Sequence, residues 1–306
     1  MSESHEQGNI GVSHQTEKLL IERETMPNYS GMFEQALVQD MVRIENKPLE
    51  QVLLALLPRA TNRASAGLSK FNVGAIVLGA SGNIYLGSNI EIPNQVCGFT
   101  VHAEQSAFAN AFNHGERDIK AVVVTAAPCG HCRQFMTEFS ISYQLPIIVK
   151  GAAPTTLANL LPEAFGPVHL GNNLGVALST GRSLKLFEAF DAEPELERAA
   201  LKAAEISYAP YSFSPSGAAV STKSGRIYSG SYIESVAFNP SLPPLQAALV
   251  SLIQSEEKAE DIVEAVVVEL KNASITQEDS ARAVLRGVQS GARFNLVYAQ
   301  PAINTQ

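Results

Sequence analysis

The sequence predicts an α/β fold that occurs twice along the chain, and three observations support this prediction. Segments with helical spacing of apolar residues alternate with short apolar runs that are typical of strands. A strand pattern in the first half returns in the second half at one constant offset, as expected of a duplicated unit. The length of 306 residues and the hydrophobic content of 45% suffice for about two folded cores.

The N-terminal part of the chain is expected to be irregular and then helical. Residues 1 to about 24 are polar and charged without periodicity, which predicts a loose tail or a weakly ordered extension. Apolar residues then recur at helical spacing from Tyr29 to Leu57, and we expect Pro58 to end the second of two helices. These helices are expected to cover one face of a sheet.

A β-hairpin is predicted next, with strands at 70–78 and 84–91 around a glycine-rich turn. Residues two apart on a strand share a face, so Asn89 and Glu91 are expected to point together. An amide beside a carboxylate can bind sugar hydroxyls, although a solvated strand face is the plainer interpretation. Phe71 is either an ordinary core residue or a ring that stacks on a planar base.

Residue types that bind metals gather in the middle of the first half. His102 is followed two residues later by Glu104, and Cys129 and Cys132 form a Cys-x-x-Cys pair. One imidazole and two thiolates could hold a zinc ion and leave the fourth tetrahedral position to water. Glu104 would then stand beside the metal without binding it, where a carboxylate can take a proton from that water and pass it on.

Two helix starts are expected to bring these residues together. Thr100 suits the N-cap position, which places His102 in the first turn of an amphipathic helix. Pro128 suits the first position of a second helix, with both cysteines on one face of its first turn. The apolar run 119–126 is expected to be a buried strand between the helices. The positive end of a helix dipole favours thiolate over thiol, so this placement suits metal binding.

Other readings of the cysteines stay open on this evidence. A Cys-x-x-Cys pair alone could be a redox dithiol or half of a structural zinc site. A structural site normally has four protein ligands, and the sequence offers no convincing fourth. We expect His131 to be exposed or to contact the ligands rather than bind the metal. Cys97 is expected to be a small, semi-buried apolar residue near the site.

These motifs together resemble the cytidine deaminases of the long-chain dimeric type. His-x-Glu followed by Pro-Cys-x-x-Cys is the signature of zinc-dependent nucleobase deaminases, and the runs 71–75 (FNVGA) and 89–91 (NIE) extend the resemblance. The resemblance implies a three-layer α/β/α fold and one zinc ion per chain. By the same resemblance, the site residues are the zinc ligands His102, Cys129 and Cys132, the catalytic Glu104, and the substrate-binding Phe71, Asn89, Ile90 and Glu91, with Phe165 as a second aromatic wall.

The reaction implied by this resemblance is hydrolytic deamination of cytidine and deoxycytidine to uridine and deoxyuridine, with release of ammonia, as in pyrimidine salvage. Three alternatives remain: a zinc deaminase for another nucleobase or a nucleotide, a non-catalytic interaction module stabilised by zinc, and a thiol redox protein. Glu104 argues against the interaction module, because a structural zinc site has no use for a proton carrier.

The second half repeats the first without its metal ligands. Residues 84–91 (IYLGSNIE) match residues 227–234 (IYSGSYIE), an offset of 227 − 84 = 143. The same offset puts Leu245 and Ala247 at the positions of the histidine and the glutamate, and no cysteine follows Cys132. We therefore expect a catalytic copy and a degenerate copy, and the resemblance implies that the degenerate copy completes the site of the neighbouring subunit in a homodimer.

Four regions follow from these patterns: a tail and helical region at 1–47, a catalytic zinc domain at 48–168, a linker at 169–186 and a degenerate copy at 187–306. The linker is rich in Pro, Gly and Asn. These boundaries rest on composition and on the repeat alone.

Composition limits the partners and the compartment. The formal net charge of −8 argues against a nucleic-acid partner, because affinity for a phosphate backbone is built largely from Lys and Arg. A small neutral or cationic substrate suits this charge better. Three cysteines, two of them in the metal motif, leave no disulfide framework and indicate a reducing cytoplasm. No apolar run approaches membrane-spanning length, so we expect no membrane partner.

Overall fold

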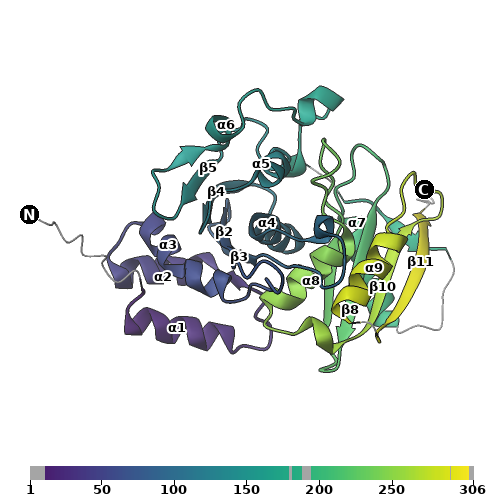
Figure 1. Ribbon diagram of the computed structural model, residues 1–306, viewed down its shortest axis with the longest axis horizontal. Coiled ribbons are helices and arrows are strands. Elements are labelled where there is room, and N and C mark those ends of the chain that lie inside the picture. The colour runs from purple at the N-terminus through teal and green to yellow at the C-terminus, as the bar shows by residue number, and fades with distance from the viewer. Residues whose placement is uncertain (1–10, 179–180, 188–193, 290, 303–306) are drawn as a thin grey trace, which may run out of the picture.

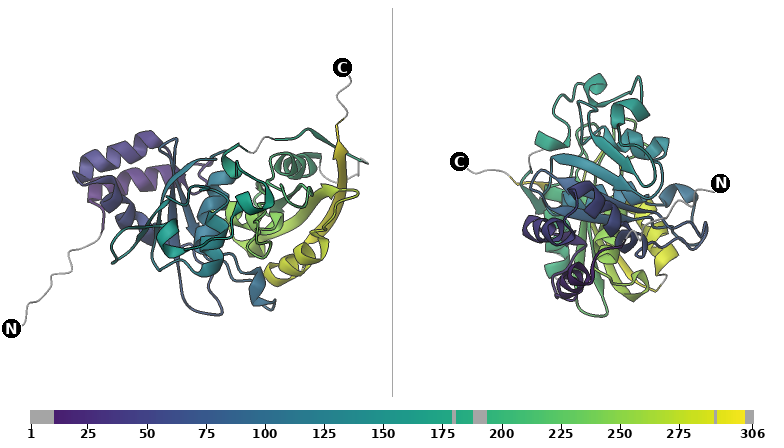
Figure 2. Two further views of the ribbon diagram at one scale, coloured as in Figure 1. Left: turned by 90° about the horizontal axis from the view of Figure 1, so that it is seen from above. Right: turned by 90° about the vertical axis from the view of Figure 1, so that its left-hand side faces the viewer.

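The computed structural model describes residues 11–178, 181–187, 194–289 and 291–302. These residues form two β-sheets, each covered by helices, and the two halves follow one another along the chain (Figure 1). The N-terminal helices and the last strand lie at opposite ends of the molecule (Figure 2). Within the described residues, every helix is too short or too polar to span a membrane.

The first half contains a six-stranded sheet. Its elements in chain order are α1 (His14–Glu24), β1 (Met32–Phe33), α2 (Gln35–Glu45), α3 (Leu49–Thr61), β2 (Gly74–Gly79), β3 (Ile84–Ser88), η1 (Cys97–Phe99), α4 (Ala103–Asn113), β4 (Ile119–Val124), α5 (Gly130–Met136), β5 (Pro146–Val149), β6 (Thr155–Thr156), α6 (Leu157–Leu160), η2 (Pro167–Leu170) and η3 (Val176–Leu178). The strand order is β1-β3-β2-β4-β5-β6.

The second half contains a five-stranded sheet in the order β7-β11-β10-β8-β9. Its elements are β7 (Leu184–Leu186), α7 (Pro194–Glu205), β8 (Ser216–Thr222), β9 (Ile227–Ser231), α8 (Pro244–Gln254), η4 (Ala259–Asp261), β10 (Ile262–Leu270), α9 (Glu278–Val288) and β11 (Arg293–Pro301). In each half, a hairpin is followed by a helix, a strand antiparallel to the hairpin, a second helix and a parallel strand.

Alternation along the strands builds three layers. Ala75 and Val77 of β2 pack in the core shared with α4 and α5, whereas Ile76 between them packs in the core shared with α1, α2 and α3. In the second half, Ala218 faces the core with α8 and α9, and Ala219 faces the core with α7. The predicted α/β class and its duplication are therefore confirmed.

The strand pairing repeats at the predicted offset. Gly74 pairs with Ser88 in the first hairpin, and Gly217 pairs with Ser231 in the second. Both partners move by the same amount, since 217 − 74 = 231 − 88 = 143. The repeat seen in the sequence is therefore a repeat of backbone geometry as well.

The loop that leads into the central helix breaks this single offset. Ile90 forms a β-bridge with Val101, a separation of 101 − 90 = 11, whereas its counterpart Ile233 forms a bridge with Leu242, a separation of 242 − 233 = 9. The second loop is two residues shorter, so the offset in the following helix is 143 − 2 = 141. A fixed offset taken from sequence cannot detect this deletion.

The shorter loop corrects the predicted counterparts of the catalytic residues. His102 is the N-cap of α4, and the N-cap of α8 is Pro243. Glu104 therefore corresponds to Leu245, and the predicted pairing of Leu245 and Ala247 with the histidine and the glutamate was wrong by two positions. Neither proline nor leucine can bind zinc or carry a proton, so the second half still lacks the site.

Helix α1 occupies residues 14–24 of the predicted loose tail, so the prediction was wrong there; residues 1–10 of that prediction lie outside the described residues. The Ser13 side chain accepts a hydrogen bond from the Thr16 N–H, 3.3 Å away, which caps the helix. Leu20 is fully buried in the core with α2 and α3. The apolar residues of α1, Leu19, Leu20 and Ile21, are consecutive and not at helical spacing, so periodicity could not reveal the helix.

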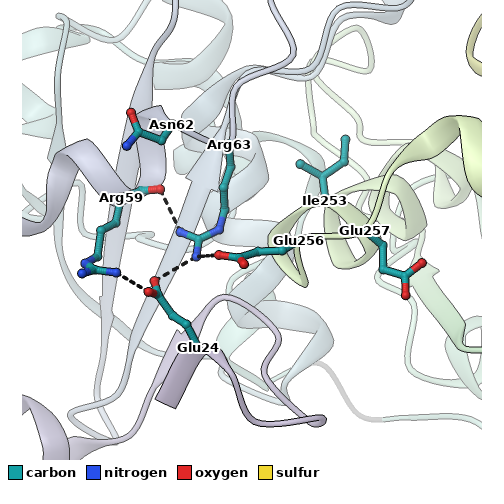
Figure 3. A pocket seen from close by; sticks show the side chains of 7 residues that line it. All are labelled: Glu24, Arg59, Asn62, Arg63, Ile253, Glu256 and Glu257. Atoms are coloured by element: carbon teal, nitrogen blue, oxygen red, sulfur yellow. Dashed lines mark hydrogen bonds and ion pairs between the residues drawn. The ribbon is translucent and has the colours of Figure 1, made fainter. Parts of the chain in front are cut away.

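Ion pairs tie α1 to both halves. The carboxylate of Glu24 lies between the guanidinium groups of Arg59 and Arg63, and Arg63 also reaches Glu256, just after α8, at 2.6 Å (Figure 3). These residues line a cleft of about 340 Å³. Both arginines in it already pair with carboxylates, so the cleft is an ion-pair network and not a free anion site.

Helix α3 continues past Pro58 to Thr61, so the predicted helix end at Pro58 was wrong. A proline removes only its own N–H from the helical hydrogen bonds. The carbonyl of Pro58 still accepts a hydrogen bond from the Asn62 N–H at 2.9 Å. The last turn therefore forms without the missing donor.

A buried carboxylate joins the halves behind α5. Glu138 is fully buried and accepts hydrogen bonds from the hydroxyls of Tyr208 and Tyr211, both at 2.8 Å, and from the Val236 N–H at 2.7 Å. Burial raises the pKa of Glu138 above its ordinary value. Three donors satisfy the buried oxygens, which makes the contact between the halves specific.

Candidate metal and active site

The three predicted ligands meet at the start of two helices. Nδ1 of His102 lies 3.3 Å from the sulfur of Cys129 and 3.3 Å from the sulfur of Cys132, and the two sulfurs are 3.6 Å apart. Among the described residues, this is the only group of three His, Cys, Asp or Glu side chains placed to hold a metal ion.

Both helices start two residues later than predicted. Helix α4 begins at Ala103, with His102 as an extended N-cap, and α5 begins at Gly130, with Cys129 as an extended N-cap. His102 is thus not in the first turn, and Pro128 precedes the helix. An N-cap residue has non-helical backbone, so its side chain can turn across the helix end toward the neighbouring helix.

The donor set fits zinc. Imidazole and thiolate are typical zinc ligands, and three protein ligands leave one position open. Tetrahedral bonds of about 2.0–2.3 Å separate ligand atoms by roughly 3.5–3.8 Å. The observed separations of 3.3–3.6 Å come close to that spacing. His102, Cys129 and Cys132 would therefore hold the ion with small adjustments.

Without a metal ion, the side chains of Cys129 and Cys132 differ in protonation. The hydrogen bond between the sulfurs lowers the pKa of Cys129 to about 4, so this residue is a thiolate at neutral pH. The same hydrogen bond and burial raise the pKa of Cys132, which keeps its proton. Metal binding must therefore release the Cys132 proton.

Glu104 is buried beside the ligands, with 5% of its surface exposed. Burial raises its pKa above the ordinary value for a glutamate. A carboxyl group that both takes and returns protons works best when its pKa approaches the working pH. Its environment therefore suits the predicted role.

A recess of about 270 Å³ opens at this point. Its lining includes Phe71, Asn89, Glu91, His102, Glu104 and Cys129, together with Thr100, which was expected only as an N-cap, and Ser69, which the sequence did not single out. Asn89 and Glu91 line one recess, as expected, but β3 ends at Ser88, so the predicted strand end at residue 91 was wrong and both residues follow the strand. Ile90 does not line it: its side chain is 1% exposed, and its backbone pairs with Val101.

The polar atoms of Asn89 and Glu91 bind backbone groups of the facing loop. Oδ1 of Asn89 accepts from the Val73 N–H at 2.9 Å, and Nδ2 donates to the Phe71 carbonyl at 3.0 Å. Glu91 accepts from the N–H groups of Leu68 and Ser69. Desolvation acts to raise the pKa of Glu91, but the hydrogen bonds outweigh it, so the pKa is lowered and the carboxylate is ionised.

The loop also explains why the first predicted strand starts late. Strand β2 begins at Gly74 and not at residue 70, because Lys70 has a left-handed backbone with φ of 58° and the Phe71 carbonyl and Val73 N–H bond the Asn89 side chain instead of a neighbouring strand. Such a backbone cannot continue a strand. The loop before β2 therefore turns its chain toward the recess.

Two contacts from the second half reach the ligand helices, and sequence analysis missed both. Gln105 accepts a hydrogen bond from the His102 N–H at 3.4 Å and donates one to the Pro240 carbonyl at 2.9 Å. The ring of His131 packs edge-on against the ring of His102, with centroids 5.6 Å apart, and hydrogen-bonds the Asn239 carbonyl at 3.1 Å. A glutamine three residues after an N-cap was the one available signal.

The structure also differs from the predictions for Cys97 and Phe165. Cys97 is exposed and not semi-buried, because it lies in the short surface turn η1. Phe165 is 47% exposed and packs against His169 with ring centroids 5.1 Å apart. It is not among the residues that line this recess.

Comparison with known proteins places both halves in one family. Two family models, both described as "Cytidine and deoxycytidylate deaminase zinc-binding region", match this chain. One matches residues 48–145 and the other matches residues 157–282. The second match lies in the half without metal ligands. It therefore reflects shared shape and descent, not a second metal site.

Full-length relatives show the same likeness. The chain is 42% identical over 265 residues to proteins named cytidine deaminase from Yersinia pseudotuberculosis and Yersinia pestis, which covers 87% of this chain and 89% of each relative. A crystal structure of cytidine deaminase from Mycobacterium tuberculosis matches with 31% identity and a TM-score of 0.33, over 36% of this chain and 91% of that one. On the strength of the two domain matches and the full-length relatives, the chain belongs to the cytidine deaminase family.

Proposed function

We propose that the protein deaminates cytidine and deoxycytidine by hydrolysis, giving uridine and deoxyuridine with release of ammonia, as part of pyrimidine salvage. One observation carries this proposal: a three-ligand zinc set and a buried proton carrier, Glu104, share a single recess. The names of the relatives in Yersinia support the choice of substrate.

The chemistry divides between the metal and Glu104. Zinc, when held by His102, Cys129 and Cys132, makes water acidic enough to supply hydroxide near neutral pH. Glu104 takes up a proton and delivers it to N3 of the pyrimidine, which makes C4 more electrophilic. After hydroxide adds to C4, Glu104 takes the proton of the new C4 hydroxyl and gives it to the amine as the C4–N bond breaks, so one buried carboxyl group serves both directions of proton transfer.

The recess favours a nucleoside over a nucleotide. Phe71 can stack on the base, and the remaining lone pairs of Asn89 and Glu91 can accept ribose hydroxyls. Ile90 would act only indirectly, because its N–H and carbonyl both pair with Val101 and hold the segment that carries Asn89 and Glu91. None of the described residues that line the recess is a lysine or an arginine. A phosphate group would lack a cationic partner there, which argues against deoxycytidylate as the main substrate.

We further propose a homodimer in a reducing cytoplasm, in which the second half completes the neighbouring recess. Large apolar side chains are exposed in both halves, with Leu68 and Phe71 in the first and Phe213 and Phe238 in the second, from 60% to 77%. Three free thiols suit a reducing compartment. Sedimentation at twice the chain mass would support the dimer, and sedimentation as a monomer at micromolar concentration would contradict it.

Glu104→Gln tests the catalytic assignment. The ultraviolet spectrum of cytidine should change to that of uridine with the wild-type protein, and the variant should lose turnover by about 10²–10⁴-fold because it cannot carry a proton. Zinc content should stay the same. Glu269→Gln, which changes a buried carboxyl group of the second half, is the matched control and should keep its turnover. Full activity in Glu104→Gln would disprove the assigned role.

Gln105→Ala tests whether the second half supports the metal site within one chain. Losing the link from His102 to Pro240 should weaken zinc binding by about 10- to 100-fold, the effect typical of groups that orient metal ligands. Competition with a chelator measures this directly. Gln246 has the same place in α8 (105 + 141 = 246) and the same 2% exposure. Gln246→Ala should therefore leave zinc binding unchanged; an equal loss in both variants would mean general destabilisation instead.

A further inference from the structure

The segment 68–71, here called the recess loop, is held in place by Glu91. The carboxylate accepts hydrogen bonds from the N–H groups of Leu68 at 2.6 Å and Ser69 at 3.0 Å. Lys70 then turns the chain with a φ of 58°, and the Phe71 N–H bonds back to the Ser69 hydroxyl at 3.1 Å. Because charged acceptors make strong hydrogen bonds, the carboxylate stabilises a turn that a non-glycine residue rarely adopts.

The second half contains the same loop, and every position in it follows the repeat offset of 234 − 91 = 143. Glu234 accepts hydrogen bonds from the N–H groups of Tyr211 at 2.8 Å and Ser212 at 3.1 Å. Phe213 has a φ of 54°, and the Ser214 N–H bonds back to the Ser212 hydroxyl at 3.2 Å. The hydrogen bonds, the left-handed residue and the serine contact are all reproduced.

The second half shows what this glutamate, Glu234, does in a site without zinc ligands or a proton carrier. Pro243 and Leu245 stand where the first half has a zinc ligand and the proton carrier. A glutamate kept beside them serves the loop, since zinc-dependent chemistry is impossible there. Tyr232 replaces Asn89, so the hydrogen bonds of Asn89 to Phe71 in the recess loop and to Val73 just after it belong to the first half alone.

We propose that Glu91 acts on turnover as a positioning residue: it fixes the recess loop so that Phe71 stands at the recess, whether or not a sugar hydroxyl is bound. Phe71 is 61% exposed, so packing alone does not hold its ring. The backbone hydrogen bonds of Glu91, with that of Asn89 to the Phe71 carbonyl, supply the missing restraint. The effect on turnover rests on the proposed deamination; the restraint on the loop does not.

Hydrogen exchange of the full-length, zinc-loaded protein without substrate tests the restraint. Glu91→Ala should speed exchange of the Leu68 and Ser69 amides by at least about tenfold, because they lose their acceptor. Glu234→Ala is the matched control and should speed exchange at 211–212 while leaving the recess loop unchanged. Glu91→Gln keeps one acceptor oxygen and should lie between wild type and Glu91→Ala; it also serves if the alanine variant fails to fold. Unchanged exchange in the Glu91 variants would overturn the proposal.

Kinetics with two substrates tests how Glu91 acts. Misplacing Phe71 should lower kcat/KM by about 10- to 100-fold. Because Glu91 works through the loop, the loss with 2′,3′-dideoxycytidine, which lacks the sugar hydroxyls, should still be at least about tenfold, and any additional loss with cytidine measures the contact with the hydroxyls. A loss that disappears with dideoxycytidine would assign Glu91 to hydroxyl binding and contradict the proposal. A wild-type protein that leaves cytidine unchanged would refute the proposed function, and hydrogen exchange would still decide the role of Glu91.

Discussion

The site depends on one constraint: the N-termini of helices α4 and α5 lie close together. His102 and Cys129 are both N-caps, and their extended backbones let the side chains cross the helix ends to within 3.3 Å of each other. The close approach of β3 to α4 fixes one of these helices, since a Cβ on Gly87 would lie 2.1 Å from the Ala107 nitrogen. The sheet therefore places α4, and α4 places its metal ligand.

The second half keeps this framework and has lost the ligands. Gly230 approaches α8 as closely as Gly87 approaches its own helix, because a Cβ on Gly230 would also lie 2.1 Å from a backbone nitrogen, that of Ala248. What survives duplication is thus the set of contacts that shape the backbone. The contacts of Asn239 and Pro240 with the ligand helices indicate that the second half now stabilises the first. A half without metal ligands can therefore still contribute to activity by stabilising the metal site of the other half.

Sequence reasoning identified the residues whose type is chemically unusual. The histidine, glutamate and two cysteines could be found because few other patterns combine them at this spacing. The hairpin and the repeat could be found because they depend on local periodicity. Helix α1 and the link from Gln105 to Pro240 could not, because each depends on contacts between distant parts of the chain. The two-residue deletion before α8 could not, because one constant offset carries no information about loop length. The double role of Asn89 and Glu91 was hidden for the same reason: their partners are backbone groups of a loop about 20 residues away.

The measurement of zinc content per chain tests whether the first half alone binds metal and the second half has only a structural role. Purified protein should contain one zinc ion per chain, and Cys132→Ser should remove it while the folded second half remains. That result would place the single metal in the first half. Two zinc ions per chain, or one ion retained in Cys132→Ser, would contradict the account.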